Sequence, residues 1–480
     1  MGIFKSKKSK GIEYKVQTFY KPEIKDKPPQ INSNSLEDIS ANEAINIIKQ
    51  NLPLENKRII GDLIMGRQDL ENPYEIDTEN GQKIQMAGLP GMKDFERWPF
   101  QNKIEVKKCV FEAKVVLSGM DFKKVVKFIS TRFCSDIDFQ LSIFNESLTI
   151  YGCSLEGSTI FSDSVFWDSV QFNRNTFNGP SDFYNTSFQK GASFAYSVFN
   201  AHCTFTNSYF KSTMLVFPCL AFTNAICYAD CYFMDTRFDG IADFGGAQFR
   251  RKVDFTNASF KYINLKQVQF NWLELKWEQV GRKKLIFGSL TLKGINVEKE
   301  YLTEEEFNHL FQNRVDVDLS EKHRQYDILK GIFLKQGDFE STDKCYYDWK
   351  QIERKESDIN LNPETWIVKI FHYLNWFSCG YGVKPIRTLL FASVLIFFFG
   401  LIYTILNSSF TLDLSLISRD NILVNSFLDN IEYSFLVFMN FTSDVSMLGP
   451  SLKLLFLIER ILGWITLLLF VTTYTRIMLR

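Results

Sequence analysis

The central part of the chain is organised by phenylalanine residues that recur at alternating steps of five and six positions. Neither regular secondary structure has this spacing, because a helix face repeats every three or four residues and a strand face every two. A backbone that turns a corner after each step would return every phenylalanine to the same inward position. The clearest members of the pattern are Phe166, Phe172, Phe177, Phe183, Phe188, Phe194, Phe199 and Phe205.

The same spacing extends in both directions from this stretch. Backwards it reaches Phe111, with Leu or Ile at some positions; forwards it passes Phe210, slips near Pro218 and continues to Phe260. The residues between are rich in Asn, Ser, Thr, Asp, Gly and Ala, which suit turns. The pattern predicts a β-solenoid of short parallel strands, whose coils bury a core only by stacking on one another. Four sides give 22 residues a coil, so residues 111–270 should form about seven coils.

These repeats resemble the phenylalanine-centred form of the pentapeptide-repeat family, over roughly Cys109 to Phe270. The resemblance implies an all-β, right-handed parallel β-helix. The chain departs from the pattern between Phe210 and Phe233, which are 23 positions apart where 22 are expected. We interpret this slip as a bulge of about one residue, and the alternative is a binding notch.

Elements at the N-terminal end of the solenoid follow from local signals. Ala41–Gln50 has helical apolar spacing, and Ser40 is a candidate N-cap. Lys57–Ile64 is typical of a first strand. A short helix at this place would cover the open end of the solenoid, whose strand edges are otherwise unpaired. Residues 65–103 are rich in Gly, Pro and charge, which predicts an excursion loop.

The period changes beyond Phe270. Thr303–Asn313 begins with a capping box. His323–Lys355 is typical of two helices broken at Gly337, and it predicts a helical hairpin. The stretch also resembles the connector of prokaryotic pentapeptide-repeat proteins that end in a two-helix membrane module.

Two apolar stretches near the C-terminus are candidates for membrane-spanning helices. Thr388–Leu406 contains no charged residue, and Leu454–Thr473 contains only Glu459 and Arg460. Each is close to the roughly 20 residues that cross a bilayer. The two charges in the second stretch are costly in lipid unless they are paired or lie near an interface.

The distribution of basic residues predicts the orientation of these helices. Lys and Arg cluster before the first stretch and after the second, and are sparse between them. The positive-inside rule therefore places both termini and the solenoid in the cytoplasm, with two helices crossing the plasma membrane. The flanking basic residues are Lys369, Lys384, Arg387, Arg476 and Arg480.

A third apolar stretch, Phe427–Asn440, lies between the two candidate spans and is too short to cross a bilayer. From about Gly380 to Arg480 the chain resembles the two-transmembrane pore-loop ion channel superfamily. The resemblance implies a homo-tetramer, with a pore helix that contains Tyr433–Ser434–Phe435. It places the start of the filter at Thr442, the proline after the filter at Pro450, and an inner-helix hinge at Gly463.

The filter itself departs from that superfamily. Gly380–Tyr381–Gly382 precedes the first span, so it should form a turn rather than a filter. Counting back from Pro450, the glycine positions of a potassium filter hold Asp444 and Ser446, and residues with a Cβ resist the backbone that glycine allows. Potassium selectivity therefore does not carry over. The candidate pore residues are Thr442, Ser443, Asp444, Val445 and Ser446.

Asp444 is the residue that we expect to attract monovalent cations, because ionisable groups within membrane modules tend to be functional. The alternative is an aspartate in a solvated loop.

The composition of the chain argues against several other functions. The 55 basic residues balance the 55 acidic ones, which gives no electrostatic basis for nucleic-acid binding and disfavours a DNA-mimicking column. The nine cysteines lack metal-binding spacing, since the close pair Cys227 and Cys231 has no histidine nearby. They are typical of small buried residues in a reducing compartment.

Neither a cofactor nor enzyme activity is expected, because no catalytic constellation is evident. The N-terminal MGIFKSKKSK fits a myristoylation pattern, although we favour a basic tail.

These observations divide the chain into four regions. They are a tail and cap helix (1–57), a β-solenoid (58–275, with the loop 65–103), a helical connector (276–365) and a pore-loop module (366–480). The leading hypothesis is an oligomeric cation channel whose cytoplasmic solenoid senses a signal or docks a protein partner. The alternative is a non-conducting, membrane-anchored scaffold.

Overall fold

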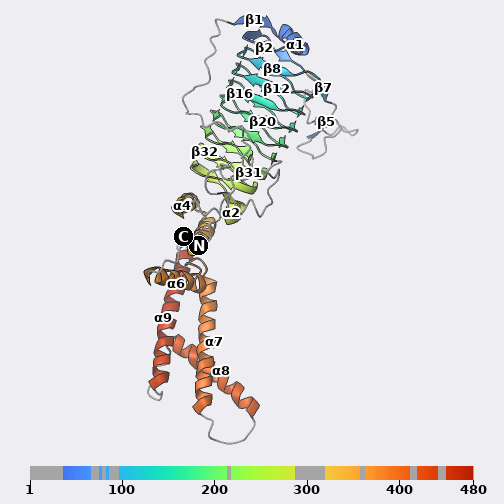
Figure 1. Ribbon diagram of the computed structural model, residues 1–480. Coiled ribbons are helices and arrows are strands. Elements are labelled where there is room, and N and C mark those ends of the chain that lie inside the picture. Colours follow the sequence, from blue (N-terminus) through green and yellow to red (C-terminus); the bar gives the residue numbers. More distant parts are fainter. Residues whose placement is uncertain are drawn as a thin grey trace, which may run out of the picture. The chain divides into compact units, whose positions relative to one another are not determined.

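The computed structural model describes most of the chain (Figure 1). The described residues are 36–65, 75–77, 83–85, 97–212, 218–286, 319–356, 363–410, 419–441 and 450–478. They belong to two compact units, one containing the solenoid strands up to Ala258 and the other running mainly from Trp272 to the C-terminus. Each unit is described by itself.

The first unit is a parallel β-solenoid, as the phenylalanine spacing predicted. It has about ten turns rather than the seven expected for residues 111–270, because strands before residue 111 also belong to it. Its strands stack into two long sheets. The first sheet contains β1 (Glu37–Ser40), β3 (Lys57–Ile60), β4 (Leu63–Ile64), β9 (Val110–Phe111), β10 (Val115–Val116), β13 (Arg132–Phe133), β14 (Ile137–Asp138), β17 (Ser154–Leu155), β18 (Thr159–Ile160), β21 (Thr176–Phe177), β22 (Ser181–Asp182), β25 (Val198–Phe199), β26 (Cys203–Thr204), β29 (Ile226–Cys227), β30 (Cys231–Tyr232), β32 (Gln248–Asp254) and β34 (Gln269–Glu274). The second contains β2 (Leu54–Glu55), β7 (Trp98–Phe100), β8 (Ile104–Lys107), β11 (Met120–Phe122), β12 (Val126–Ile129), β15 (Ile143–Phe144), β16 (Leu148–Tyr151), β19 (Val165–Phe166), β20 (Val170–Gln171), β23 (Ser187–Phe188), β24 (Ala192–Ser193), β27 (Tyr209–Lys211), β28 (Pro218–Ala221) and β31 (Arg237–Asp243).

The phenylalanine ladder forms the core of this solenoid. All eight residues from Phe166 to Phe205 in the pattern are 0% exposed. Rings one coil apart stack nearly parallel: the centroids of Phe166 and Phe188 are 5.1 Å apart, and those of Phe177 and Phe199 are 4.6 Å apart. Parallel pairing of β19 with β23, in which Phe166 lies opposite Phe188, produces this alignment. Register therefore converts the sequence spacing into continuous aromatic columns.

The alternation of five- and six-residue steps has a backbone cause. Every five-residue step between Phe161 and Phe210 contains one residue with a positive φ near 50–60°. A left-handed residue turns the chain sharply, so these sides close a corner with fewer residues. The residues are Asp163, Arg174, Asn185, Tyr196 and Asn207.

Buried hydroxyl groups complete the corners. Thr186 Oγ1 donates a hydrogen bond to the carbonyl of Phe161 (2.9 Å), and the Thr186 backbone N–H donates to Ser208 Oγ (3.0 Å). Ser164 and Ser208 donate in the same way to Phe139 and Phe183. Because buried backbone carbonyls need partners, Ser or Thr at this position of each coil satisfies a group that an apolar side chain would leave unpaired.

The departure near Pro218 is larger than the bulge that we expected. Before it, paired residues such as Asn185 and Asn207 are 22 positions apart, whereas Cys203 and Cys231 are 28 positions apart. Six residues are therefore inserted after β27, and the one-residue slip was wrong. Phe222 lies between Phe210 and Phe233 and packs against Phe194 of the preceding coil. The spacing from Phe210 to Phe233 therefore does not measure one coil of the repeat. Residues 213–217 lie outside the described residues.

A helix covers the N-terminal end as predicted, but Lys57–Ile64 is not the first strand. It forms β3 and β4, and β1 and β2 before it already pair with solenoid strands. Helix α1 (Ala41–Lys49) follows Ser40, whose hydroxyl accepts a hydrogen bond from the Glu43 backbone N–H (3.2 Å) within a capping box. The helix buries Ala44 and Ile48 against the first coils, and it lies at that end of the solenoid in Figure 1. Within the segment expected as a loop, β5 (Glu75–Asp77) pairs with β6 (Lys83–Gln85), and β7 joins the solenoid beside β11.

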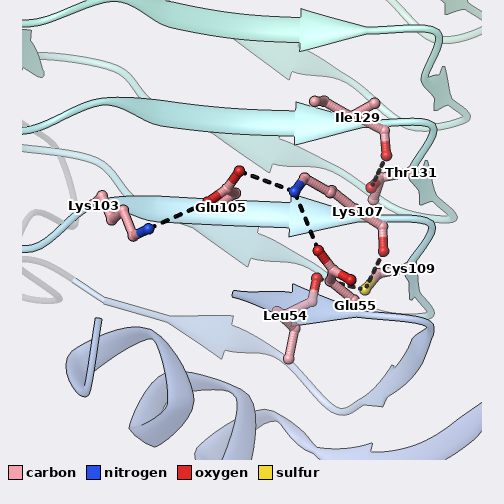
Figure 2. Close-up of polar contacts among 8 residues, drawn as sticks. All are labelled: Leu54, Glu55, Lys103, Glu105, Lys107, Cys109, Ile129 and Thr131. Atoms are coloured by element: carbon pink, nitrogen blue, oxygen red, sulfur yellow. Dashed lines mark hydrogen bonds and ion pairs between the residues drawn. The ribbon is translucent and has the colours of Figure 1, made fainter. Parts of the chain in front are cut away.

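Charged side chains on the outside of the first coils neutralise one another. Figure 2 shows Lys107 between Glu55 and Glu105, with Nζ–O distances of 3.2 and 3.0 Å. Lys103 also contacts Glu105. Beyond the corner at Lys108, the buried Cys109 thiol lies 3.3 Å from the carbonyl oxygens of both Leu54 and Lys107, either of which can accept its hydrogen, and burial raises its pKa to about 11. This surface therefore offers paired charges rather than a stripe of one sign.

The second unit is mainly helical. The pair of helices expected in residues 323–355 forms as α4 (Leu319–Lys335) and α5 (Phe339–Glu356), and the chain turns between them at Gly337, which has a φ of 73°. The predicted helix Thr303–Asn313 lies outside the described residues. The elements of this unit are β33 (Ser259–Asn264), α2 (Trp277–Lys284), β35 (Leu285–Ile286), α4 (Leu319–Lys335), α5 (Phe339–Glu356), α6 (Pro363–Ser378), α7 (Pro385–Phe410), α8 (Arg419–Phe438) and α9 (Pro450–Met478).

Candidate functional site

Two helices of the second unit are long and apolar enough to cross a membrane, and they coincide with the two stretches chosen from the sequence. The spans are Pro385–Leu406 in α7 and Lys453–Met478 in α9. Only 17% and 22% of their most apolar parts are buried. A core helix of a soluble protein would bury most of such a surface, so this exposure is what a helix in contact with lipid would show.

Helix α8 packs against both of these helices through glycines. A Cβ atom added to Gly400 of α7 would lie 3.0 Å from the Ile431 Cα atom of α8. A Cβ atom added to Gly463 of α9 would lie 2.2 Å from the carbonyl oxygen of Phe438. Gly463, which we selected as a hinge, thus permits close approach of two helices. Its role as a hinge stays a prediction.

A buried polar cluster joins the three helices at one point. Glu459 of α9 accepts a hydrogen bond from the Tyr403 hydroxyl of α7 (2.7 Å) and is also hydrogen-bonded to the Ser434 hydroxyl of α8. Glu459 and Ser434 are 0% exposed, and Tyr403 is 3% exposed. The carboxyl group noted in the sequence as costly in lipid thus has hydrogen-bond partners on two other helices.

A count of hydrogens shows how this cluster is satisfied. Ser434 Oγ also lies 2.9 Å from the carbonyl oxygen of Ile396, which can only accept. Since the serine has a single hydroxyl hydrogen, it cannot donate both to Ile396 and to an ionised Glu459. All three contacts are satisfied when Glu459 carries a proton and donates it to Ser434, while Tyr403 donates to the other carboxyl oxygen. The protonated form also keeps the apolar helix junction uncharged.

Cationic side chains join the ends of both long helices to the connector. Arg476 Nη2, in the last turn of α9, lies 3.2 Å from Asp343 Oδ1 of α5, and its guanidinium lies over the Tyr346 ring. At the start of α7, Arg387 Nη1 donates to the Tyr347 hydroxyl (3.1 Å). These arginines were selected only as topology signals, and the sequence carried no sign of their partners on α5. The arrangement ties both long helices to one connector helix.

Of the two segments compared with a channel filter, the structure describes only the glycine-rich one before α7. Thr442, Ser443, Asp444, Val445 and Ser446 lie outside the described residues, so their roles stay predictions. The Gly380–Tyr381–Gly382 segment forms a turn between α6 and α7 in which all three residues have positive φ angles. This is the interpretation reached from the sequence.

Stacking also gathers three cysteines that the sequence separates. The Sγ atoms of Cys203, Cys227 and Cys231 lie within 4.8 Å of one another, and all three residues are 0% exposed. The expectation from spacing missed this group, because Cys203 meets Cys231 only through pairing of β26 with β30. A thiophilic metal would bind these sulfur atoms as thiolates. Burial raises the pKa of Cys227 and Cys231 well above the usual range, whereas at Cys203 burial is outweighed by hydrogen bonds with these two thiols, which lower its pKa to about 5.

Comparison with known proteins supports the solenoid. Residues 222–269 match a family model described as pentapeptide repeats in nine copies. No curated protein and no solved structure matches the chain. The matched residues are the last coils of the first unit and the chain just beyond them, and the coils before them have the same parallel pairing and inward phenylalanines.

The fold and this match define the class of the protein. It combines a pentapeptide-repeat β-solenoid with a helical C-terminal region that contains two helices capable of spanning a membrane.

Proposed function

We propose that the protein is an oligomeric membrane cation channel whose pentapeptide-repeat solenoid is a cytoplasmic sensing or docking domain. One observation carries the proposal: helix α8 is held between α7 and α9 by the Glu459–Ser434–Tyr403 cluster. With 20 residues (Arg419–Phe438), α8 is longer than the stretch Phe427–Asn440 predicted from the sequence, but among the described helices it is not one of those apolar enough to cross a membrane. Such a helix gains a fixed depth from two helices that can cross. This is the arrangement that a pore helix requires.

The segment after α8 would supply the pore lining. In a homo-tetramer, four copies of Asp444 would form a ring of carboxylates, which attracts cations in a narrow lumen of low dielectric constant. Monovalent cations are the proposed permeant ions. The positive-inside rule supports cytoplasmic termini and plasma-membrane insertion.

A membrane-anchored scaffold is the second candidate, and a specific observation favours it. Asp444 and Ser446 replace the glycines that a carbonyl-lined filter needs. In this case α7, α8 and α9 would anchor and oligomerise the protein, and the solenoid would bind a partner.

Current recordings separate the two functions. We expect purified, full-length protein in planar bilayers to carry cation current, and Asp444→Asn to reduce it. Glu146→Gln, a carboxylate of the solenoid surface, is the matched control and should leave the current unchanged. Stable oligomers that carry no current under any applied voltage would overturn the channel proposal and favour the scaffold.

A further inference from the structure

Helix α6 presents a broad apolar face to the outside of the second unit. Its exposed apolar residues cover most of the helix circumference, and only the side that carries Lys369, His372 and Trp376 is half-buried. The strongest case is Phe371, which is 60% exposed. The other residues of this face are Trp366, Ile367, Val368, Ile370, Tyr373, Leu374 and Phe377, each 51–55% exposed.

The remaining side of α6 is occupied by contacts to α5. Trp376 Nε1 donates a hydrogen bond to the Tyr347 hydroxyl (3.2 Å). The Arg354 guanidinium lies 4.2 Å from the centre of the Trp376 ring and 5.1 Å from that of Tyr373. The helix is therefore held to the connector by one side, which leaves the apolar face directed away from it.

The apolar face lies next to the start of the first candidate span. The Phe377 ring meets the Phe391 ring of α7 edge-on, with centroids 5.5 Å apart. Figure 1 shows α6 crosswise to α7 at this end. On α7 itself, Leu389 and Leu390 are 51% and 62% exposed, so the outward apolar surface continues from one helix to the other.

We propose that α6 is an interfacial helix whose apolar face docks on the lipid bilayer, at the boundary between headgroups and acyl chains. A helix rich in aromatic residues on one side, with polar contacts on the other, is what such a position requires. Lys369 on α6, with Lys384 and Arg387 at the start of α7, adds positive charge close to this end of the span. The inference rests on the proposed membrane location of α7, but not on ion conduction.

Site-directed spin labelling of the full-length protein in phosphatidylcholine and phosphatidylglycerol liposomes tests the proposal. The background is Cys134→Ser, because Cys134 is half-buried and the other eight cysteines are buried. Labels at Phe371→Cys and Leu374→Cys report on the apolar face. A label at His372→Cys serves as the matched control, because His372 is four positions from Trp376 and lies on the side of α6 that contacts α5. A label at Phe398→Cys in the middle of α7, where the native side chain is 54% exposed, tests the membrane location itself.

We expect the ratio of collisions with oxygen to collisions with a nickel chelate to be several-fold higher at Phe371 and Leu374 than at His372. The labels at Phe371 and Leu374 should also report a shallower depth than the label at Phe398. If the label at Phe371 collided mainly with the nickel chelate while the label at Phe398 gave collision rates typical of lipid, the interfacial position of α6 would be overturned and the membrane location of α7 would stand. Low collision rates with both reagents at Phe371 would show that protein, such as a second copy, covers this face, and would also overturn it. Aqueous values at Phe398 would refute the membrane location on which the inference rests.

Discussion

The Phe222 ring stacks on the Phe249 ring, with centroids 6.0 Å apart and planes 6° apart, although the two residues belong to different columns of the solenoid. Phe222 also lies nearly parallel to Phe199, at 11°. Toward Phe244, the next phenylalanine of its own column, its ring is tilted by 51°. Cys227 explains the arrangement, since it lies opposite Phe199 in the position of a phenylalanine. Phe222 fills the space that the smaller side chain leaves.

This packing predicts the effect of restoring the missing aromatic residue. Cys227→Phe should destabilise the solenoid by roughly 1–3 kcal/mol, because Phe222 already occupies the space. The matched control is Tyr228→Phe, the next residue, whose side chain is 52% exposed and should tolerate the change. Thermal and denaturant unfolding of the two variants measures the difference. A Cys227→Phe variant as stable as the control would contradict the assignment of that space to Phe222.

The regular part of the ladder predicts a larger effect. Phe188→Ala should cost roughly 3–5 kcal/mol, since it removes a fully buried ring that stacks between Phe166 and Phe210 and leaves a cavity. Gln189→Ala, one position further, should be nearly neutral, because that side chain points outward. Equal shifts of the unfolding midpoint for both variants would refute the inward position of Phe188.

The proton count at the helix junction predicts how Glu459 can be replaced. Glu459→Gln should keep the assembly intact, because an amide accepts from Tyr403 and donates to Ser434 as a protonated carboxyl group does. Glu459→Ala should loosen α8, since it leaves both hydroxyl groups buried without this partner. Thermal stability of the detergent-solubilised protein, followed by size-exclusion chromatography, distinguishes the two variants. If Gln destabilised the protein as much as Ala, a protonated Glu459 would be ruled out.

These examples show how far the sequence predicts the structure. The phenylalanine columns were predictable because each coil repeats after 22 residues, so local spacing determines which residues face inward. The tilt of Phe222 was not, since it follows from Cys227 lying opposite Phe199, and a six-residue insertion hides that pairing in the sequence. The partners of Glu459 were not predictable either. They depend on the rotation of three helices about their axes, and apolar sequences all round a helix leave that rotation undetermined.

The orientation of the membrane helices is a separate prediction. Reporter domains fused after Arg480 and before Met1 should both be active in the cytoplasm, because the basic residues cluster before α7 and after α9. A reporter inserted in the segment between α7 and α8 is the control and should report the outside. An external C-terminus would mean that only one of the two helices crosses the membrane.

The final prediction concerns ion selectivity, and it follows from the residues at the filter position. Potassium preference requires backbone carbonyls that replace the hydration shell of the ion, and Asp444 and Ser446 stand where the necessary glycines would be. The channel should therefore discriminate poorly between sodium and potassium while favouring cations over anions through the Asp444 carboxylates. Reversal potentials in opposed sodium and potassium solutions, and then in a salt gradient, measure both preferences. Asp444→Asn should lower the preference for cations over anions, whereas Ser446→Ala, which changes no charge, should keep it. A strong preference for potassium would refute the filter assignment, and an Asp444→Asn channel with unchanged cation preference would mean that this aspartate lies away from the ion path.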